Sequence, residues 1–386
     1  MDESPATRYL GLGLRIGRHV DGMVDAYYGP RELADAVDAE PLAEPRTLVA
    51  DAEALLDGLD DGWLRDQVLG LHTFAGVLAG ETLAYADEVE RCYGVRPTFT
   101  DESVFAAAHE RLDELLPGEG TLAERFEEWE KSIRIPTEQV ERVVAAAIDV
   151  ARARTRDIVD LPDGEGVELE IVRDVPWLAF CAFEGELRSR IQVNVDLPIS
   201  AVEALVLTIH ETYPGHHAER AAKEQLLVRG QGLLEETIVM VPTPQSVVSE
   251  GIASLAPHLL LDGDGAQALA AVTREAGVEL DVEHAQAVRR AKEPCGWASV
   301  NAALMLYEDG ARDDEVVAYA RRWGLATEEV ANHLLRFLKE PTSRTYVITY
   351  DAGLELCRAW VGDDPARFRK LLTEQVRVRD LVGATR

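Results

Sequence analysis

Apolar residues recur three and four positions apart along most of the N-terminal half, with acidic residues and arginines between them. This spacing is typical of amphipathic helices, which bury one face and expose the other. We therefore expect the first part of the chain to be a set of packed helices. The clearest helical patterns cover residues 7–28, 62–92, 101–116 and 138–161.

The pattern changes between residues 167 and 196, where apolar and polar residues alternate and β-branched residues are frequent. This alternation predicts a small β-sheet. Pro198 ends the region, and Ser200 with Glu203 has the spacing of a capping box, which predicts the start of a helix. That helix runs through residues 205–209 into a cluster of histidines.

From residue 242 onward the pattern is helical again, and the chain contains no repeat, low-complexity tract or long linker. The simplest organisation is one elongated, mainly α domain with a small β-sheet, spanning residues 1–386. Within it, residues 1–165 form a helical part. Residues 166–386 supply the sheet, the helices around the histidines and the C-terminal helices.

The chain carries 70 acidic and 39 basic residues, and its formal net charge of -31 is spread along the whole length. Such a balance argues against nucleic acid as a partner, because phosphate binding depends on Lys and Arg. Only five of the basic residues are lysines. This composition is typical of halophilic proteins, in which salt screens the repulsion among carboxylates. An acidic protein from an ordinary mesophile is the alternative.

The four cysteines lie far apart, with no spacing typical of a zinc knuckle or a disulfide framework. The first residues lack a basic stretch followed by an apolar one, and no run of about 18 uncharged apolar residues occurs. We therefore expect a soluble, unexported cytoplasmic protein with no membrane partner. At 386 residues the chain can bury a core without a stabilising metal, so a metal site would serve chemistry.

The strongest local signal is the segment 210–217, which reads HETYPGHH and holds three of the nine histidines. In the HExxH arrangement, two histidines one helical turn apart bind one zinc, and the glutamate acts as general base. On an unbroken helix His210 and His216 would point to different faces. His210 and His217 would share a face but lie about 10 Å apart along the axis. Neither pair could bind one metal on a regular helix.

Pro214 and Gly215 resolve this difficulty, because proline removes a backbone donor and glycine accepts unusual dihedral angles. A local bulge of two residues would place His216 where the second ligand of HExxH belongs, whereas His217 would need a three-residue excursion. We therefore predict His216 as the ligand. His217 would then point to the other side, where it could bind substrate or orient a ligand.

A zinc hydrolase commonly has a third protein ligand and an open position for water. The best candidate is Glu250, on a predicted helix with Thr243 as N-cap and Pro244 at its first position. Apolar neighbours indicate that this stretch is buried, and a buried carboxylate is costly unless it is paired or binds a metal. A carboxylate paired with a buried arginine is the alternative.

Four segments together resemble the zincin-like metallopeptidase family catalogued as domain of unknown function 885. The most specific is HETYPGHH at 210–217, and the others are EGIA at 250–253, VDAYYGP at 24–30 and the closing segment 341–353. The resemblance extends through nearly the whole chain.

The resemblance implies a mostly helical fold of the gluzincin kind. It also implies one zinc ion bound by His210, His216 and Glu250, with Glu211 as the catalytic base. The family often has a large aromatic residue two places after the glutamate ligand. This chain has Ile252 there, so the wall of the pocket differs.

The predicted chemistry follows from these parts. Zinc acidifies a water molecule and polarises the substrate carbonyl, while Glu211 takes the proton and passes it to the leaving amine. A later segment must steady the oxyanion. Tyr350 is our first candidate for this role and Tyr346 is the second, although either residue could equally be aromatic packing in a helical core.

Substrate could be held by the strand at residues 187–194, if it is an edge strand that pairs with an extended peptide. Arg188, Arg190 or Arg344 could bind a substrate carboxylate, because a guanidinium matches its geometry. In an acidic protein rich in arginine, each could equally be a surface ion-pair partner.

We therefore predict a zinc-dependent hydrolase, and a peptidase before other kinds, that acts on a peptide or small amide. Two alternatives stay open. One is a metal-dependent hydrolase of a non-peptide amide or ester, and the other is a non-catalytic binding protein on a zincin scaffold. The sequence does not separate exopeptidase from endopeptidase, and it does not give the oligomeric state.

Overall fold

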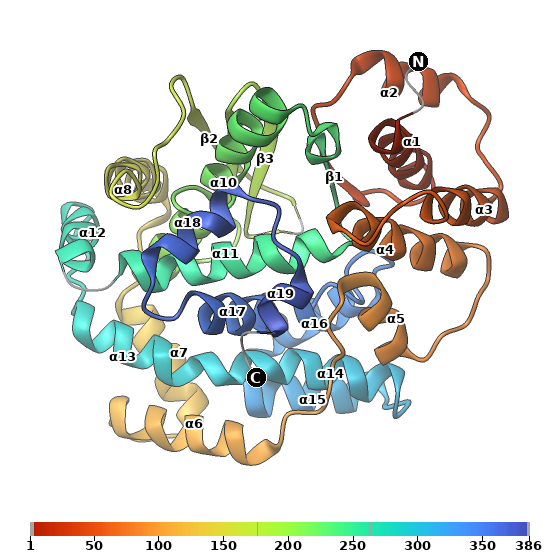
Figure 1. Ribbon diagram of the computed structural model, residues 1–386. Helices are drawn as coiled ribbons and strands as arrows, with labels where there is room; N and C mark the ends of the chain where they lie inside the picture. The colour runs from red at the N-terminus through yellow and green to blue at the C-terminus, as the bar shows by residue number, and fades with distance from the viewer. Residues whose placement is uncertain (1–3, 176, 262–263, 384–386) are drawn as a thin grey trace.

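The structure is a computed structural model that describes residues 4–175, 177–261 and 264–383. These residues form a mainly helical protein with two small sheets, which confirms the class expected from the hydrophobic pattern (Figure 1).

The helices before the main sheet are α1 (Pro5–Gly17), α2 (Arg31–Ala39), α3 (Pro45–Leu56), α4 (Trp63–Leu78), α5 (Tyr85–Tyr93), α6 (Glu102–Leu115), α7 (Leu122–Ser132) and α8 (Val140–Thr155). The helices after it are α9 (Ala201–Glu211), α10 (His216–Lys223), α11 (Pro244–Leu260), α12 (Asp264–Glu275), α13 (Val282–Lys292), α14 (Trp297–Tyr307), α15 (Asp313–Gly324), α16 (Glu328–Lys339), α17 (Ile348–Val361), α18 (Pro365–Thr373) and α19 (Val378–Val382). The strands are β1 (Val24–Tyr27), β2 (Gly166–Val172), β3 (Ala179–Gly185), β4 (Arg188–Asn194) and β5 (Ile238–Met240).

The helix expected over residues 7–28 is wrong in its second half. The helix α1 ends at Gly17, and the chain then forms β1, which pairs antiparallel with β5. The partner strand belongs to the later half of the chain, so a distant pairing overrides the local helical pattern. This two-stranded sheet joins the expected helical part, residues 1–165, to the rest of the protein.

The helix expected over residues 62–92 is two helices, α4 and α5, separated by residues 79–84. The patterns at 101–116 and 138–161 correspond to α6 and α8. Asp101 caps α6 by accepting a hydrogen bond from the backbone N–H of Ser103. Strong local signals therefore located these helices.

The expected small sheet is present and has the strand order β2-β4-β3. β4 pairs in parallel with β2 on one side and antiparallel with β3 on the other. The prediction that residues 187–194 form an edge strand is therefore wrong. Both backbone edges of β4 are already hydrogen-bonded within the sheet, so this strand cannot pair with an extended peptide.

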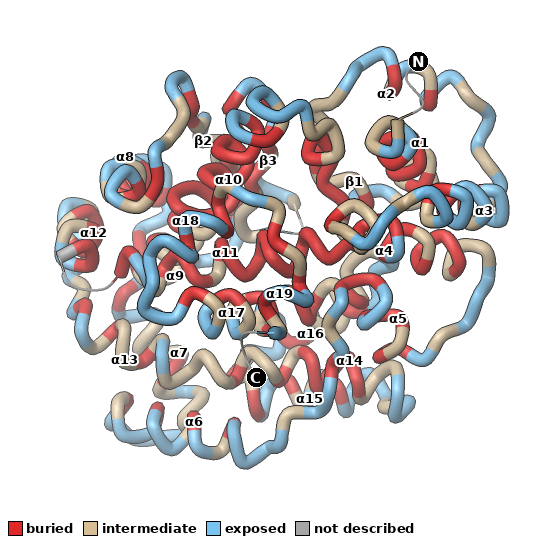
Figure 2. Tube along the Cα trace, viewed as in Figure 1, coloured by how far each residue is buried: buried red, intermediate tan, exposed pale blue. Residues whose placement is uncertain are grey.

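The two largest apolar cores hold most of the helices together. The first four helices gather at one end of the molecule around Tyr9, Leu48 and Leu71, and the β1–β5 pair completes this core (Figure 1). The larger core includes residues of α5, α8, α9, α11 and α17. Figure 2 shows α11 crossing the centre of the molecule as an almost entirely buried helix. This helix carries Glu250.

The backbones of α11 and α17 touch at Gly251 and Gly353. A Cβ atom on Gly251 would overlap the carbonyl oxygen of Gly353, and a Cβ on Gly353 would overlap that of Val247. Glycine is therefore required at both positions for this close packing. The contact brings the start of α17 beside the turn of α11 that presents Glu250.

Candidate metal centre

The histidine motif lies on two consecutive helices. α9 begins at its N-cap Ser200, whose side chain accepts a hydrogen bond from the N–H of Glu203, as the sequence predicted. It ends at Glu211, and a new helix, α10, begins at His216. The predicted two-residue bulge within one helix is therefore wrong, because the chain breaks the helix over residues 212–215 and starts another.

Gly215 allows the chain to pass close against the last turn of α9. A Cβ atom at this position would overlap the carbonyl oxygens of both His210 and Ile209. The backbone of the break is itself hydrogen-bonded, since the N–H of Ala218 donates to the carbonyl of Thr212 at 3.1 Å. The break therefore has a defined geometry that turns the side chain of His216 back toward His210.

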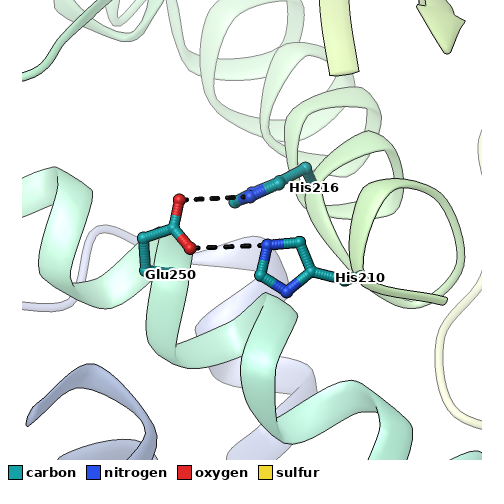
Figure 3. Close-up of side chains that lie close together, drawn as sticks. All are labelled: His210, His216 and Glu250. Carbon is teal, nitrogen blue, oxygen red and sulfur yellow. Dashed lines mark ion pairs between the residues drawn. The ribbon is translucent and has the colours of Figure 1, made fainter. Parts of the chain in front are cut away.

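His210, His216 and Glu250 converge on one point, as Figure 3 shows. The Nε2 atom of His210 lies 3.4 Å from Oε2 of Glu250, and Nε2 of His216 lies 3.4 Å from Oε1. The two imidazole rings are nearly perpendicular, with centroids 4.8 Å apart. Among the described residues, this is the group of His, Cys, Asp and Glu side chains that could hold a metal ion.

The geometry of these three side chains fits zinc. A tetrahedral zinc ion with ligand atoms at about 2.0–2.1 Å holds those atoms about 3.4 Å apart. Each histidine lies at this distance from one of the two Glu250 oxygens, and one ligand atom from each residue lies within 4.8 Å of the others. Oε2 of Glu250 is buried and has no hydrogen-bond donor within the described part of the chain. Such an orphaned carboxylate oxygen is costly unless a cation satisfies it. Two imidazoles and one carboxylate are also a common donor set of catalytic zinc.

The contacts between Glu250 and the two histidines also affect the protonation of these side chains. Burial lowers the pKa of His216, but the Glu250 carboxylate outweighs the burial and raises this pKa to about 9. Burial raises the pKa of Glu250, but the charges of His216 and His210 outweigh it and hold the pKa well below the usual range. A proton on the His216 imidazole thus offsets the charge of the carboxylate, and a bound metal ion would displace it.

Further side chains hold the three donors in place. The hydroxyl of Tyr346 donates to Oε1 of Glu250 at 2.6 Å. Nδ1 of His216 lies 3.2 Å from Oγ of Ser249, which donates to Glu219 at 2.6 Å. Contacts of this kind fix the orientation of metal ligands and tune their basicity.

Glu211 follows His210 on the last turn of α9 and is also buried. Burial raises its pKa, and the two histidines offset the burial only in part. Beside Glu211 lies a hollow of about 270 Å³, a figure that includes space open to solvent, lined mostly by apolar residues of α8, α9, β3 and β4. The apolar surroundings explain why its carboxylate is a stronger base than an exposed one.

Tyr350 and Tyr346 meet edge to face, with ring centroids 5.5 Å apart. Tyr350 is 39% exposed, and its hydroxyl has no hydrogen-bond partner among the described residues. Loss of solvent raises its pKa, and the charges of Glu250 and Glu211 raise it further, so the phenol keeps its proton. Tyr346 is committed to Glu250, while Tyr350 is free to donate to another group.

His217 points away from the three donors, as the sequence predicted, but it does not reach a substrate site. Its side chain is fully buried, with Nδ1 2.7 Å from Oγ of Ser189 and Nε2 3.1 Å from Oε2 of Glu165. Glu165 also accepts hydrogen bonds from Tyr213 and Arg152. Both ring nitrogens are therefore occupied, which corrects the expectation that His217 binds substrate.

The three candidate arginines have other surroundings. Arg190 pairs with Glu184 at 2.7 Å, and Arg344 pairs with Glu88. Arg188 is exposed on β4 and its guanidinium covers the backbone of Gly166. Arg190 and Arg344 thus have ion-pair partners within the protein. For all three arginines, a role in binding a substrate carboxylate stays a prediction.

Several residues at the centre were not indicated by the sequence. Asp25 on β1 and Arg220 on α10 form an ion pair beside His216, with 3.3 Å between Oδ2 and the nearer nitrogen. Ser249 and Glu219 support His216. Glu219 and Arg220 lie three and four residues after His216, so all three side chains lie on one face of the helix. This spacing was the sequence signal that could have indicated them. Thr243 stands at the predicted N-cap position of α11, but its hydroxyl donates to the carbonyl of Met240 and does not cap the helix.

Within the described residues, no helix is both long enough and apolar enough to cross a membrane. All four cysteines are buried and free, which confirms that they form no disulfide.

No protein-family model and no curated protein matches this chain. Solved structures with a similar fold include two proteins named as candidate lipoproteins. The first, from Colwellia psychrerythraea, has a TM-score of 0.56 at 14% identity; the match covers 92% of this chain and 64% of that one. The second, of unknown function and from Shewanella oneidensis, has a TM-score of 0.53 at 10% identity; the match covers 92% of this chain and 76% of that one. This chain thus spans about two thirds of the length of the Colwellia protein, and at such low identity the likeness shows a shared fold alone.

Proposed function

We propose that the protein is a zinc-dependent hydrolase that cleaves peptide bonds. The observation that carries this proposal is the convergence of His210, His216 and Glu250 beside the buried carboxylate of Glu211. His210, His216 and Glu250 would hold the zinc ion, which would supply Lewis acidity to acidify a water molecule and polarise the substrate carbonyl.

Glu211 acts as the general base. It lies next to His210 in the chain and its pKa is raised, so its carboxylate accepts a proton from water more readily than an exposed glutamate does. The same group then returns the proton to the leaving amine. A pure binding protein would have no use for a buried carboxylate at this position.

Tyr350 donates a hydrogen bond to the oxyanion that forms on the substrate carbonyl. Its hydroxyl keeps its proton, makes no other hydrogen bond within the described residues and lies near Glu250 and Glu211. Tyr346 instead orients Glu250 through their 2.6 Å hydrogen bond. This division reduces the two sequence candidates for oxyanion stabilisation to one.

The resemblance of the HETYPGHH segment to domain of unknown function 885 supports the same chemistry and a gluzincin-type fold. The fold shared with the two candidate lipoproteins adds no activity, because neither is named for one. We propose a cytoplasmic location from the four free cysteines. The names of the two structural neighbours favour the cell envelope instead, and fractionation of native cells would decide.

The proposal is tested with the zinc-loaded protein and a panel of peptides, with simple esters and non-peptide amides assayed in parallel. We expect peptide cleavage that is lost on chelation and restored by zinc. Glu211→Gln should keep the metal and lose turnover by several orders of magnitude, because the donors survive while the proton acceptor does not. Cleavage of esters alone would favour the non-peptide alternative. Near-normal turnover in Glu211→Gln would remove this residue from the mechanism.

A further inference from the structure

A third carboxylate stands beside the metal centre but does not belong to it. Asp25 lies on β1, where 24% of its side chain is exposed, against 6% for Glu250. It is not among the side chains that converge within 4.8 Å to form the metal group. Asp25 is therefore placed to act on something other than the metal.

The position of Asp25 follows from its contact with Arg220. Arg220 is one helical turn after His216 on α10, so the two side chains lie on the same face of that helix. Oδ2 of Asp25 lies 3.3 Å from the nearer nitrogen of Arg220. The carboxylate is thus held next to the face of α10 that presents the His216 ligand.

Asp25 also lies within electrostatic range of groups at the metal centre. Its charge acts on Glu211 and on both tyrosines, Tyr346 and Tyr350, and raises the pKa of each. These groups belong to α9 and to the C-terminal segment, whereas Asp25 comes from β1. Its ion pair with Arg220, on the His216 face of α10, thus brings Asp25 close to the residues to which we assign the general base and the oxyanion donor.

The capacity of Asp25 for hydrogen bonds is only partly used. Its one ion pair, with Arg220, is long at 3.3 Å, and no other donor reaches it among the described residues. A carboxylate can accept about four hydrogen bonds. Arg220 itself is buried, and its Nε has no partner in the described structure. The pair is therefore anchored in the protein, and part of the Asp25 carboxylate remains accessible.

We propose that Asp25 binds the α-ammonium group of the substrate, so that the enzyme removes residues from free N-termini. This inference rests on the proposed function. The α-nitrogen of the N-terminal residue is separated from the first peptide carbonyl by a single carbon atom. When that carbonyl lies at the metal, the ammonium group must lie beside the metal group. An ammonium with three donors suits a partly exposed carboxylate there.

The experiment compares two metal-chelating probes, leucine hydroxamate and N-acetyl-leucine hydroxamate, by isothermal titration calorimetry on the zinc-loaded protein. Both carry the same chelating group and the same apolar side chain. Only leucine hydroxamate has a free ammonium group, because the amine of the other probe is acetylated. We expect the free amine to bind about 10-fold more tightly or better, as one charge-assisted hydrogen bond gives. In Asp25→Asn this difference should disappear, with the affinity for the acetylated probe unchanged.

The matched control is Asp21→Asn, which removes an exposed carboxylate four residues earlier and should keep the preference. If the wild-type protein binds both probes equally, the Asp25 inference is overturned while the metal centre stands. If neither probe binds, the metal centre and the inference fail together. The wild-type comparison decides the inference even if Asp25→Asn does not fold. A preference that survives in folded, zinc-loaded Asp25→Asn would also overturn it.

Discussion

The Oγ atom of Ser249 lies 3.2 Å from Nδ1 of His216 and donates its own hydrogen to Glu219. Because the hydroxyl hydrogen is used toward Glu219, the lone pair of Oγ must accept from the N–H at Nδ1 of His216. This arrangement leaves Nε2 of His216, on the Glu250 side, as the nitrogen able to bind a metal. Lys223 donates a 2.7 Å hydrogen bond to Glu219. We call this chain of hydrogen bonds, from His216 through Ser249 and Glu219 to Lys223, the relay.

Ser249→Ala should weaken zinc binding by about 10-fold, because the loss of such a contact frees the orientation and tautomer of the ligand. The control is Ser246→Ala on the same helix, since the Ser246 hydroxyl is also buried but donates to backbone carbonyls of Met240 and Val241. Zinc affinity measured by competition with a chelator should fall in the first variant and not in the second. Equal affinities in the two variants would show that the relay does not support His216.

The two tyrosines should differ when each loses its hydroxyl. Tyr346→Phe should lower zinc affinity by about 10-fold, because its hydroxyl orients Glu250. Tyr350→Phe should keep the metal and lower kcat by about 100-fold, as loss of an oxyanion donor does. Metal content and steady-state kinetics distinguish the two effects. A fall in kcat for Tyr346→Phe at full zinc occupancy, with Tyr350→Phe unaffected, would exchange the two roles.

The adjacent histidines should give opposite results. His216→Ala should strip the metal, because it removes one of three donors. His217→Ala should retain zinc but lower the free energy of unfolding by about 2 kcal/mol, since it removes the two buried hydrogen bonds that the imidazole makes with Glu165 and Ser189. Elemental analysis and urea denaturation measure both. Zinc loss in His217→Ala, with zinc kept in His216→Ala, would contradict the ligand assignment.

The sequence correctly predicted the structural features that depend on local pattern. Helices with clear caps, such as α6 behind Asp101 and α9 behind Ser200, lie where the pattern placed them. The helix break at Pro214 and Gly215 was foreseen as a distortion, although its form was not. A bulge and a break use the same two residues, and only the packing of α10 decides between them.

The local sequence pattern could not predict contacts between segments that are distant in the chain. The strand at Val24–Tyr27 exists because Ile238–Met240 pairs with it, and β4 is central because β2 returns beside it. The same holds at the candidate centre. The motif indicated His210, His216 and Glu250, but the approach of Asp25 to Arg220 depends on the three-dimensional path of β1.

The net charge of -31 predicts a strong dependence of stability on salt. Repulsion among closely spaced carboxylates weakens as the Debye length falls from about 10 Å at 0.1 M to about 3 Å at 1 M. We expect Tm to rise steeply over this range of potassium chloride, with partial unfolding in dilute buffer. The measurement is differential scanning calorimetry at fixed pH, and a constant Tm would refute the halophilic interpretation.

The most direct test of the account is the zinc content of the purified protein. Purification without chelators and at high salt, followed by elemental analysis, should give about one zinc per chain. Glu250→Ala, which removes the carboxylate that both histidines face, should give little or none. The absence of zinc and every other transition metal from the wild-type protein, even after incubation with zinc and dialysis, would contradict the central claim.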